Sequence, residues 1–389
     1  MRRRIAGILL HPTSLPGRFG IGDLGPGLDR FLDWAQAAGQ RLWQTLPLGP
    51  PVMGGCPYTC LSAFAGSPML ISPELLAQEG LLEPEDLADL PDFPSGRVDF
   101  GAVEPWKQTL LRRSWHRFEQ RASAALRSEL EAFLEHPDQR GWLDDWTLFS
   151  ALKTHYGEKL WQEWDAEIAL RVPGALAEAR RLLAGEIAFH GYLQWLFFRQ
   201  WRRVRHEAHR RGIEIMGDLP IYVSTDSAEV WAHPQLFDLD EAGWPRHVAG
   251  VPPDYFSEDG QLWGNPLYRW ERMAATGYRW WIERIAANLR LTDIVRIDHF
   301  RAFCDYWQVP AGETTARGGR WVDGPGIEIF DAIRAAFGTL PLVAEDLGAI
   351  HPGIEALRRR AGLPGMCVLQ FGFHGAESTH ARTTASARR

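Results

Sequence analysis

DIVRIDHF, at residues 293–300, is a short apolar run that ends abruptly in charged side chains, and PLVAEDLG, at residues 341–348, has the same form. This pattern is typical of buried parallel strands whose carboxyl ends open into an active site. We therefore expect two strands of one parallel sheet, each with chemically active groups at its end.

Side chains two residues apart in a strand lie on the same face, so Arg296 and Asp298 should share a surface. The guanidinium would then keep Asp298 ionised, as a nucleophile or charge stabiliser requires. Glu345 has no basic residue beside it in the sequence. Apolar surroundings would raise its pKa, which suits a proton donor. Two carboxylates with different environments are the usual equipment for breaking a glycosidic bond.

The rest of the chain alternates between apolar runs and helical periodicity, as a barrel of strands and helices requires. Four further strands are predicted, at residues 5–10, 41–48, 213–223 and 366–373. Helices are predicted at residues 24–38, 186–211, 273–289, 327–338 and 353–362. Charged groups gather at the strand ends, at Asp218, Asp298 and Glu345, and the chemistry of such barrels lies at that face. The predicted fold class is α/β, a (β/α)8-type TIM barrel with helical insertions and about six of the eight strands present.

Four segments follow from this pattern. Residues 1–71 hold the first barrel units and a long loop rich in glycine and proline, which we interpret as a substrate loop. Residues 72–184 show only helical periodicity and are interpreted as a helical insertion subdomain. Residues 185–373 carry barrel strands 3 to 6, with a long lid loop at 223–269. Residues 374–389 form a tail without strand or helix period that looks unrelated to the rest.

Composition excludes several classes of function. The 389 residues are 45% hydrophobic and 23% charged, which allows a sizeable core. A net charge of -7 gives no reason to expect a nucleic-acid partner, and no run reaches membrane-spanning length. The four cysteines are too few and too scattered for a disulfide framework, so we expect a reduced, cytoplasmic protein. Many of the 18 tryptophans should fill the core, although flat aromatic faces also bind sugar rings.

The segment GVPPDYFSEDGQLWGNP, at residues 250–266, has the composition of a lid over a sugar site. Its aromatic faces for stacking are Tyr255, Phe256 and Trp263, and its partners for hydroxyl groups are Asp254 and Asn265. A lid would exclude water, so that a covalent glycosyl-enzyme is resolved by another sugar. His299 could equally bind a sugar hydroxyl or cap its strand.

A metal site is the chemical rival. Asp218, Asp298 and Glu345 at successive strand ends could hold magnesium, with Asp346 as a further ligand. Arg296 would point a positive charge into the same pocket and disfavour a cation. We prefer glycosidic chemistry, and two alternatives stay open: a non-catalytic or vestigial chain that binds α-glucan, and a magnesium-dependent barrel enzyme.

Motifs along nearly the whole chain resemble those of the 4-α-glucanotransferases, also called amylomaltases or disproportionating enzymes, within the α-amylase-like retaining enzymes. The similar segments include ILLHPTSLPG (8–17), GDLPIYV (217–223), DSAEVWAHP (226–234), VRIDHFRAF (295–303), VAEDLG (343–348) and GLPGM (362–366). The resemblance implies transfer between malto-oligosaccharides or other α-glucans, with no cofactor or metal. It implies a nucleophile at Asp298, an acid/base at Glu345, Arg296 and His299 beside the sugar, and Tyr58, Asp254 and Trp263 along its path.

Two departures from the family pattern stand out. The first long loop reads VMGGCPYTC at residues 52–60, with Met53 where the family has an aromatic residue and Cys56 where it has a serine. The family also continues through two more strands that supply a third essential carboxylate, and nothing here corresponds to them. We therefore expect a C-terminally truncated chain with little or no activity.

Overall fold

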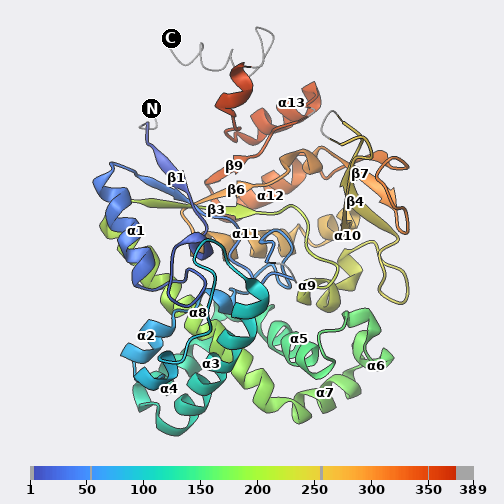
Figure 1. The fold of residues 1–389 in the computed structure, drawn as a ribbon. Coiled ribbons are helices and arrows are strands. Elements are labelled where there is room, and N and C mark those ends of the chain that lie inside the picture. The colour runs from blue at the N-terminus through green and yellow to red at the C-terminus, as the bar shows by residue number, and fades with distance from the viewer. Residues whose placement is uncertain (1–3, 53–54, 255–256, 349, 374–389) are drawn as a thin grey trace.

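The computed structural model describes residues 4–52, 55–254, 257–348 and 350–373. Five parallel strands form its central sheet, side by side in the order β1 (Gly7–Leu9), β2 (Leu42–Gln44), β3 (Glu214–Leu219), β6 (Ile294–Ile297) and β9 (Leu342–Ala344) (Figure 1). Every neighbouring pair in that order is parallel. The α/β class and the parallel barrel-type sheet are therefore confirmed.

Helices join these strands, because parallel neighbours need a long crossover. The helices are α1 (Pro26–Ala37) between β1 and β2, α8 (Ala184–Arg210) before β3, α10 (Trp270–Ala275) and α11 (Arg279–Leu291) before β6, α12 (Glu328–Phe337) before β9, and α13 (Pro352–Ala361) after it. Sequence analysis predicted α10 and α11 as parts of one helix. The break falls where Gly277 and Tyr278 both adopt positive φ, at 63° and 57°.

The predicted strand at residues 366–373 is wrong. The segment is extended at its start and ends in a 3-10 helix, Leu369–Phe373. Met366 donates its backbone N–H to Asp346 Oδ1 at 2.7 Å. This N–H is therefore bonded to a side chain and not to a neighbouring strand. Leu369 is 60% exposed, so the apolar pattern here does not report a buried strand.

A second sheet was not foreseen. Its four strands are antiparallel, in the order β5 (Gln261–Pro266), β4 (His247–Val251), β7 (Asp305–Pro310) and β8 (Arg320–Asp323). β4, β5 and the short helix α9 (Ala228–Ala232) lie within residues 223–269, which we expected to be one long lid loop. Figure 1 shows β4 and β7 beside the central sheet. β4 lies between β5 and β7, and β7 begins more than 50 residues further along the chain.

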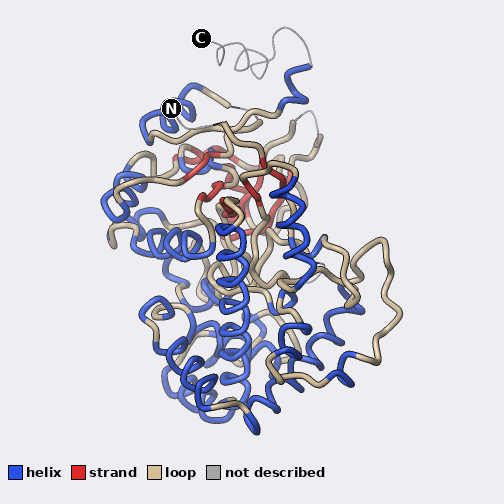
Figure 2. Tube along the Cα trace, turned by 90° about the vertical axis from the view of Figure 1, so that its left-hand side faces the viewer, coloured by secondary structure: helices blue, strands red, loops and turns tan. Residues whose placement is uncertain are grey.

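Residues 72–184 contain helices and no strands. Their α-helices are α2 (Pro73–Gln78), α3 (Phe100–Arg121), α4 (Ala124–Glu135), α5 (Leu143–His155), α6 (Ala166–Ala169) and α7 (Pro173–Leu182). Figure 2 shows the strands gathered in one part of the molecule and these helices filling the other. No helix among the described residues is both long enough and apolar enough to span a bilayer.

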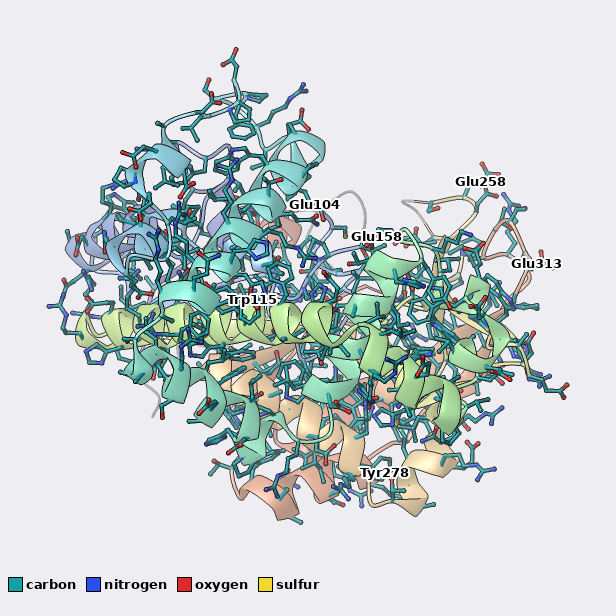
Figure 3. The ribbon with its side chains drawn as sticks, turned by 90° about the horizontal axis from the view of Figure 1, so that it is seen from below. Glu104, Trp115, Glu158, Glu258, Tyr278 and Glu313 are labelled. Atoms are coloured by element: carbon teal, nitrogen blue, oxygen red, sulfur yellow. The ribbon has the colours of Figure 1, made fainter. Side chains whose placement is uncertain are left out.

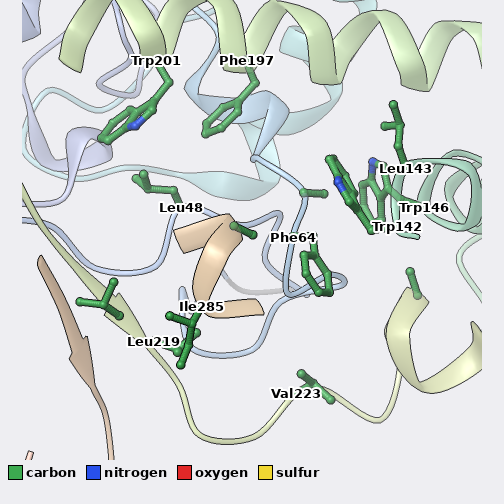
Figure 4. Close-up of a cluster of buried hydrophobic side chains, with 14 of the residues drawn as sticks. Leu48, Phe64, Trp142, Leu143, Trp146, Phe197, Trp201, Leu219, Val223 and Ile285 are labelled. Carbon is green, nitrogen blue, oxygen red and sulfur yellow. The ribbon is translucent and has the colours of Figure 1, made fainter. Parts of the chain in front are cut away.

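The long helix α8 joins the two parts. It crosses the molecule with Trp115 of α3 packed against it, and the ring of Trp115 lies 5.1 Å from that of Tyr192 (Figure 3). Phe197 and Trp201 of α8 face a buried cluster that also contains Phe64 and Trp142 (Figure 4). The core is therefore continuous between the helical part and the sheet.

Two buried glutamines of α8 hold the loop that follows β2. Gln194 accepts the N–H of Gly66 at 2.8 Å and donates to its carbonyl at 3.0 Å. Gln200 does the same for Ser72, at 2.7 and 3.3 Å. Each amide replaces a strand partner, because the loop has no sheet ladder to satisfy its backbone.

The close approach at Gly66 generates a stability prediction. A Cβ atom there would lie 1.9 Å from the ring of Phe197, so Gly66→Ala should lower the free energy of unfolding by roughly 1 to 3 kcal/mol. Denaturant unfolding measures the loss. Gly96→Ala is the matched control, because no atom lies within 4 Å of a Cβ at that position. Equal stability of the two variants would contradict the packing described here.

Candidate active site

The carboxyl ends of β3, β6 and β9 bring together the polar residues that the sequence singled out. The strand register pairs Asp218 with Arg296, and Arg296 with Val343. Asp298 follows β6 and Glu345 follows β9. Because paired residues in neighbouring strands point to the same side of a sheet, Asp218 and Arg296 share one surface.

Arg296 bridges two aspartates. Its Nη1 lies 2.7 Å from Asp218 Oδ1, and its Nη2 lies 2.8 Å from Asp298 Oδ1. The Asp218 side chain is 1% exposed and that of Arg296 is 12% exposed, whereas Asp298 keeps 31% of its side-chain surface open. The predicted shared face of Arg296 and Asp298 is thus present. Of the two aspartates, Asp298 is the one that a ligand can reach.

Asp218 is fully engaged by the protein. Its second oxygen accepts a hydrogen bond of 2.7 Å from the Tyr58 hydroxyl. Burial raises the pKa of Asp218, and the charge of Arg296 opposes this rise. Burial and the adjacent charge of Asp218 also raise the pKa of Tyr58, so this hydroxyl stays protonated and donates. Asp218 therefore holds Arg296 and Tyr58 in place.

Glu345 sits in a different environment. Its Oε2 accepts the backbone N–H of His299 and its Oε1 that of Leu347, both at 2.9 Å. Burial raises the pKa of Glu345, the Leu347 N–H opposes the rise, and the negative charge of Asp298 adds to it. The direction agrees with the expectation from sequence. Glu345 therefore keeps its proton to a higher pH than an ordinary glutamate does.

His299 turns the chain after Asp298. It adopts a left-handed conformation with φ of 54°, which only a few per cent of residues other than glycine adopt, and the 3-10 helix Phe300–Phe303 starts directly after it. Burial lowers the pKa of its ring to about 4, so the imidazole is neutral at physiological pH. The ring packs edge-on against Trp263, with centroids 4.8 Å apart.

The predicted lid residues have different positions. Trp263 reaches the site through its contact with His299. Asn265 donates to the carbonyl of Val223 at 2.8 Å and so ties β5 to the chain that leaves β3. Asp254 accepts the N–H of Ser257 at 2.8 Å, within its own turn. Tyr255 and Phe256 lie outside the described residues, as does Met53 in the earlier loop.

The magnesium alternative finds no support in this geometry. The guanidinium of Arg296 already occupies the space between Asp218 and Asp298 as their counter-ion. Asp346, the suggested extra ligand, pairs with Arg358 at 2.8 Å and accepts the N–H of Met366. Arginine side chains therefore neutralise the three aspartates, and Glu345 is held by two backbone N–H groups.

Sequence reasoning missed three residues that support the site. Met366 accepts the Nε–H of Arg296 at 3.3 Å, and only its place in the GLPGM motif pointed to it. Arg284 of α11 donates to the carbonyls of Pro220 and Ile221, at 2.6 and 2.9 Å, and so fixes the chain after β3. No local pattern distinguishes this arginine from the others on amphipathic helices.

Glu229 of α9 is the third. It is 4% exposed, and it accepts the Ser62 hydroxyl at 2.6 Å and the Ala63 N–H at 3.0 Å. The loop that it holds carries Tyr58. Burial raises the pKa of Glu229 to about 6, and the bonds from Ser62 and Ala63 limit the rise. Glu229 thereby links α9 to the tyrosine that contacts Asp218.

Comparisons with known proteins agree with this geometry. The sequence pattern of the family described as 4-alpha-glucanotransferase matches residues 10–388. The 4-alpha-glucanotransferase of Thermus thermophilus is 51% identical over 370 residues, which cover 95% of this chain and 73% of the relative. That of Synechocystis is 50% identical over 373 residues, with 95% and 74% covered.

A solved structure matches as well. The amylomaltase from Streptococcus agalactiae in complex with acarbose superposes with a TM-score of 0.93 at 39% identity, covering 97% of this chain and 76% of that one. The resemblance seen in the sequence motifs is confirmed at the level of the whole fold. The chain belongs to the 4-alpha-glucanotransferase family of enzymes.

Proposed function

We propose that this enzyme transfers α-1,4-glucan segments between malto-oligosaccharides, with retention, through a covalent intermediate on Asp298. The observation that supports these roles most directly is the contrast between the two carboxylates. Both are half-buried, but Asp298 is ion-paired with Arg296, whereas Glu345, at the end of the neighbouring strand, is held by backbone N–H groups and has a raised pKa. One is suited to attack as an anion and the other to deliver a proton.

In the first step, Asp298 attacks the anomeric carbon of the donor glucan. Glu345 gives its proton to the glycosidic oxygen, whose bond to the anomeric carbon breaks, and the leaving segment departs with a free 4-hydroxyl. In the second step, Glu345 takes the proton from the 4-hydroxyl of an acceptor glucan. That oxygen replaces Asp298 on the anomeric carbon, and two inversions give net retention.

The electrostatics supports the change of role that Glu345 must make. The negative charge of Asp298 helps to raise the pKa of Glu345. Formation of the glycosyl ester removes that charge, so the pKa of Glu345 falls and it becomes able to act as a base. The chemistry uses only groups of the chain itself, and the proposal includes no cofactor.

The sugar contacts are proposals from sequence and position. His299, neutral at working pH, and Arg296 would hydrogen-bond the sugar in the bond-breaking subsite, and Trp263 would offer a stacking face. Tyr58, Asp254, Asn265, Tyr255 and Phe256 would border the glucan path. Asp218, predicted from sequence as a further sugar contact, would act only through Arg296 and Tyr58, because its side chain is 1% exposed. The absence of a nucleic-acid partner and the cytoplasmic location stay predictions from composition.

Replacement of the nucleophile tests the function first. Asp298→Asn should lower the rate of glucose release from maltotriose by roughly 10⁴-fold or more, because the amide cannot form the glycosyl ester. Mass spectrometry of the oligomer ladder and a glucose assay measure it. Asp331→Asn, on an exposed aspartate of α12, is the control and should leave the ladder unchanged. If the wild type binds acarbose but yields no ladder, the chain is a non-catalytic glucan binder.

Replacement of the proton donor should give a different result. Glu345→Gln should abolish disproportionation of maltotriose but leave formation of the glycosyl-enzyme from α-maltotriosyl fluoride, because fluoride departs without protonation. Intact-mass measurement detects the adduct. Loss of both reactions to the same extent would contradict the role assigned to Glu345.

The pH dependence follows from the direction of the Glu345 pKa. Activity should fall as pH rises through the pKa of Glu345, and burial places that fall above the pH at which an ordinary glutamate titrates. A profile of kcat/KM against pH measures this basic limb for maltotriose. With α-maltotriosyl fluoride in single-turnover experiments the limb should disappear, and its persistence would assign it to another group.

Glu229 provides a prediction about stability. Its pKa rises from 4.5 to about 6 on folding, so its contribution is fully present below pH 4.5 and is lost as pH rises through 6. The difference in unfolding free energy between the wild type and Glu229→Gln should therefore change by about 2 kcal/mol across that window. Urea unfolding at several pH values measures it. A difference that is independent of pH would contradict the raised pKa.

A further inference from the structure

A group of metal-binding side chains converges outside the proposed catalytic machinery. The thiol of Cys304, the carboxylate of Asp305 and the ring of His351 have ligand atoms within 4.8 Å of one another. Within the described part of the chain, no other three His, Cys, Asp or Glu side chains meet that condition. We propose that these three residues, called here the 304/305/351 cluster, bind a divalent transition-metal ion of the zinc type.

The fold explains why these residues meet. Cys304 and Asp305 lie where the 3-10 helix after β6 passes into β7, and His351 is the residue that caps the start of α13 after β9. Because β6 and β9 are parallel neighbours, the segments that leave them emerge at the same end of the sheet. All three side chains are half-buried, so an ion can enter from solvent.

The donor set matches the preference of zinc for sulfur and nitrogen ligands. Zinc in proteins takes thiolate, imidazole and carboxylate ligands in a tetrahedral arrangement, and three protein ligands with one water is a common set. The distance from His351 Nε2 to Asp305 Oδ2 is already 2.9 Å, so both atoms can contact one ion after small movements. The charges of a thiolate and a carboxylate would balance those of a divalent ion.

Two neighbouring interactions lower the affinity of the 304/305/351 cluster for a metal ion. Arg301 pairs with Asp305 at 2.8 Å and repels a cation. His351 Nδ1 accepts the N–H of Gly353 at 3.1 Å, so Nε2 carries the ring proton and donates it to Asp305. Metal binding at Nε2 moves that proton to Nδ1 and breaks the bond from Gly353. The site should therefore bind more weakly than a dedicated structural zinc site.

Metal binding is coupled to loss of the proton from the Cys304 thiol. Burial raises the pKa of Cys304, the charge of Asp305 adds to the rise, Arg301 opposes it, and Asp323 of β8 adds a smaller increase. A metal ion binds the thiolate, so each binding event releases one proton from Cys304 to solvent. Affinity should therefore increase towards alkaline pH.

A purely structural role is the competing interpretation. Arg301, Asp305 and His351 form a continuous ion-pair network that also caps α13, and such a network does not require Cys304. The two interpretations differ in whether the thiolate contacts the ion. Spectroscopy of a cobalt-substituted protein distinguishes them, because sulfur ligation adds a charge-transfer band that oxygen and nitrogen ligation lacks.

The experiment titrates Co²⁺ into the reduced, chelator-treated full chain at mildly alkaline pH. The expected result is one ion per chain with a thiolate-to-cobalt charge-transfer band in the near ultraviolet, and displacement of the cobalt by Zn²⁺. Cys304→Ser should remove the band. His351→Asn should weaken binding by about 100-fold while the protein stays folded, because asparagine can still cap the helix.

Two other cysteines provide matched controls. Cys56 and Cys367 are exposed cysteines elsewhere on the chain, and their replacement by serine should leave the band and the affinity unchanged. The proposal is overturned if the wild type shows no band, if the band survives in Cys304→Ser, or if it is lost in Cys56→Ser. None of these readouts involves glucan turnover, so they test the metal site independently of the proposed function.

Discussion

The bridge from Arg296 to Asp218 and Asp298 is the interaction on which the rest of the site depends. A carboxylate as deeply buried as Asp218 is costly unless a counter-ion and hydrogen bonds accompany it, and Arg296 and Tyr58 supply them. The same guanidinium uses its other Nη group to orient Asp298. The bridge therefore joins β3 to β6 through side chains as well as backbone. It also neutralises a pocket that would otherwise hold adjacent negative charges.

The loops around this bridge are held by polar side chains of helices. Gln194 and Gln200 of α8, Glu229 of α9 and Arg284 of α11 all bind backbone groups of loops that border the site. Loops without a sheet ladder must satisfy their N–H and C=O groups in some other way. Side chains of the packed helices supply these hydrogen bonds, and each one holds a particular backbone group of the loop. The site thus combines loop chemistry with the rigidity of helices.

The sequence predicted the features that depend on local pattern. Apolar runs ending in charge identified β6 and β9, and alternation along a strand identified the shared face of Arg296 and Asp298. Features that depend on distant pairing were missed. β4 occupies an inner position in its sheet because the distant β7 pairs with the edge that β5 leaves open, and Glu229 matters because Ser62 lies against it. The error at residues 366–373 has the same origin, since an apolar run becomes a strand only where a neighbour accepts its backbone bonds.

The antiparallel sheet has a mechanical consequence. Trp263 belongs to β5, β5 pairs with β4, and β4 pairs with β7, which leaves the catalytic region a few residues after Asp298. Trp263 and the chain that carries Asp298 are therefore parts of one hydrogen-bonded frame. Because β5 cannot shift without breaking its ladder to β4, this frame fixes the position of Trp263 relative to the chain that carries Asp298.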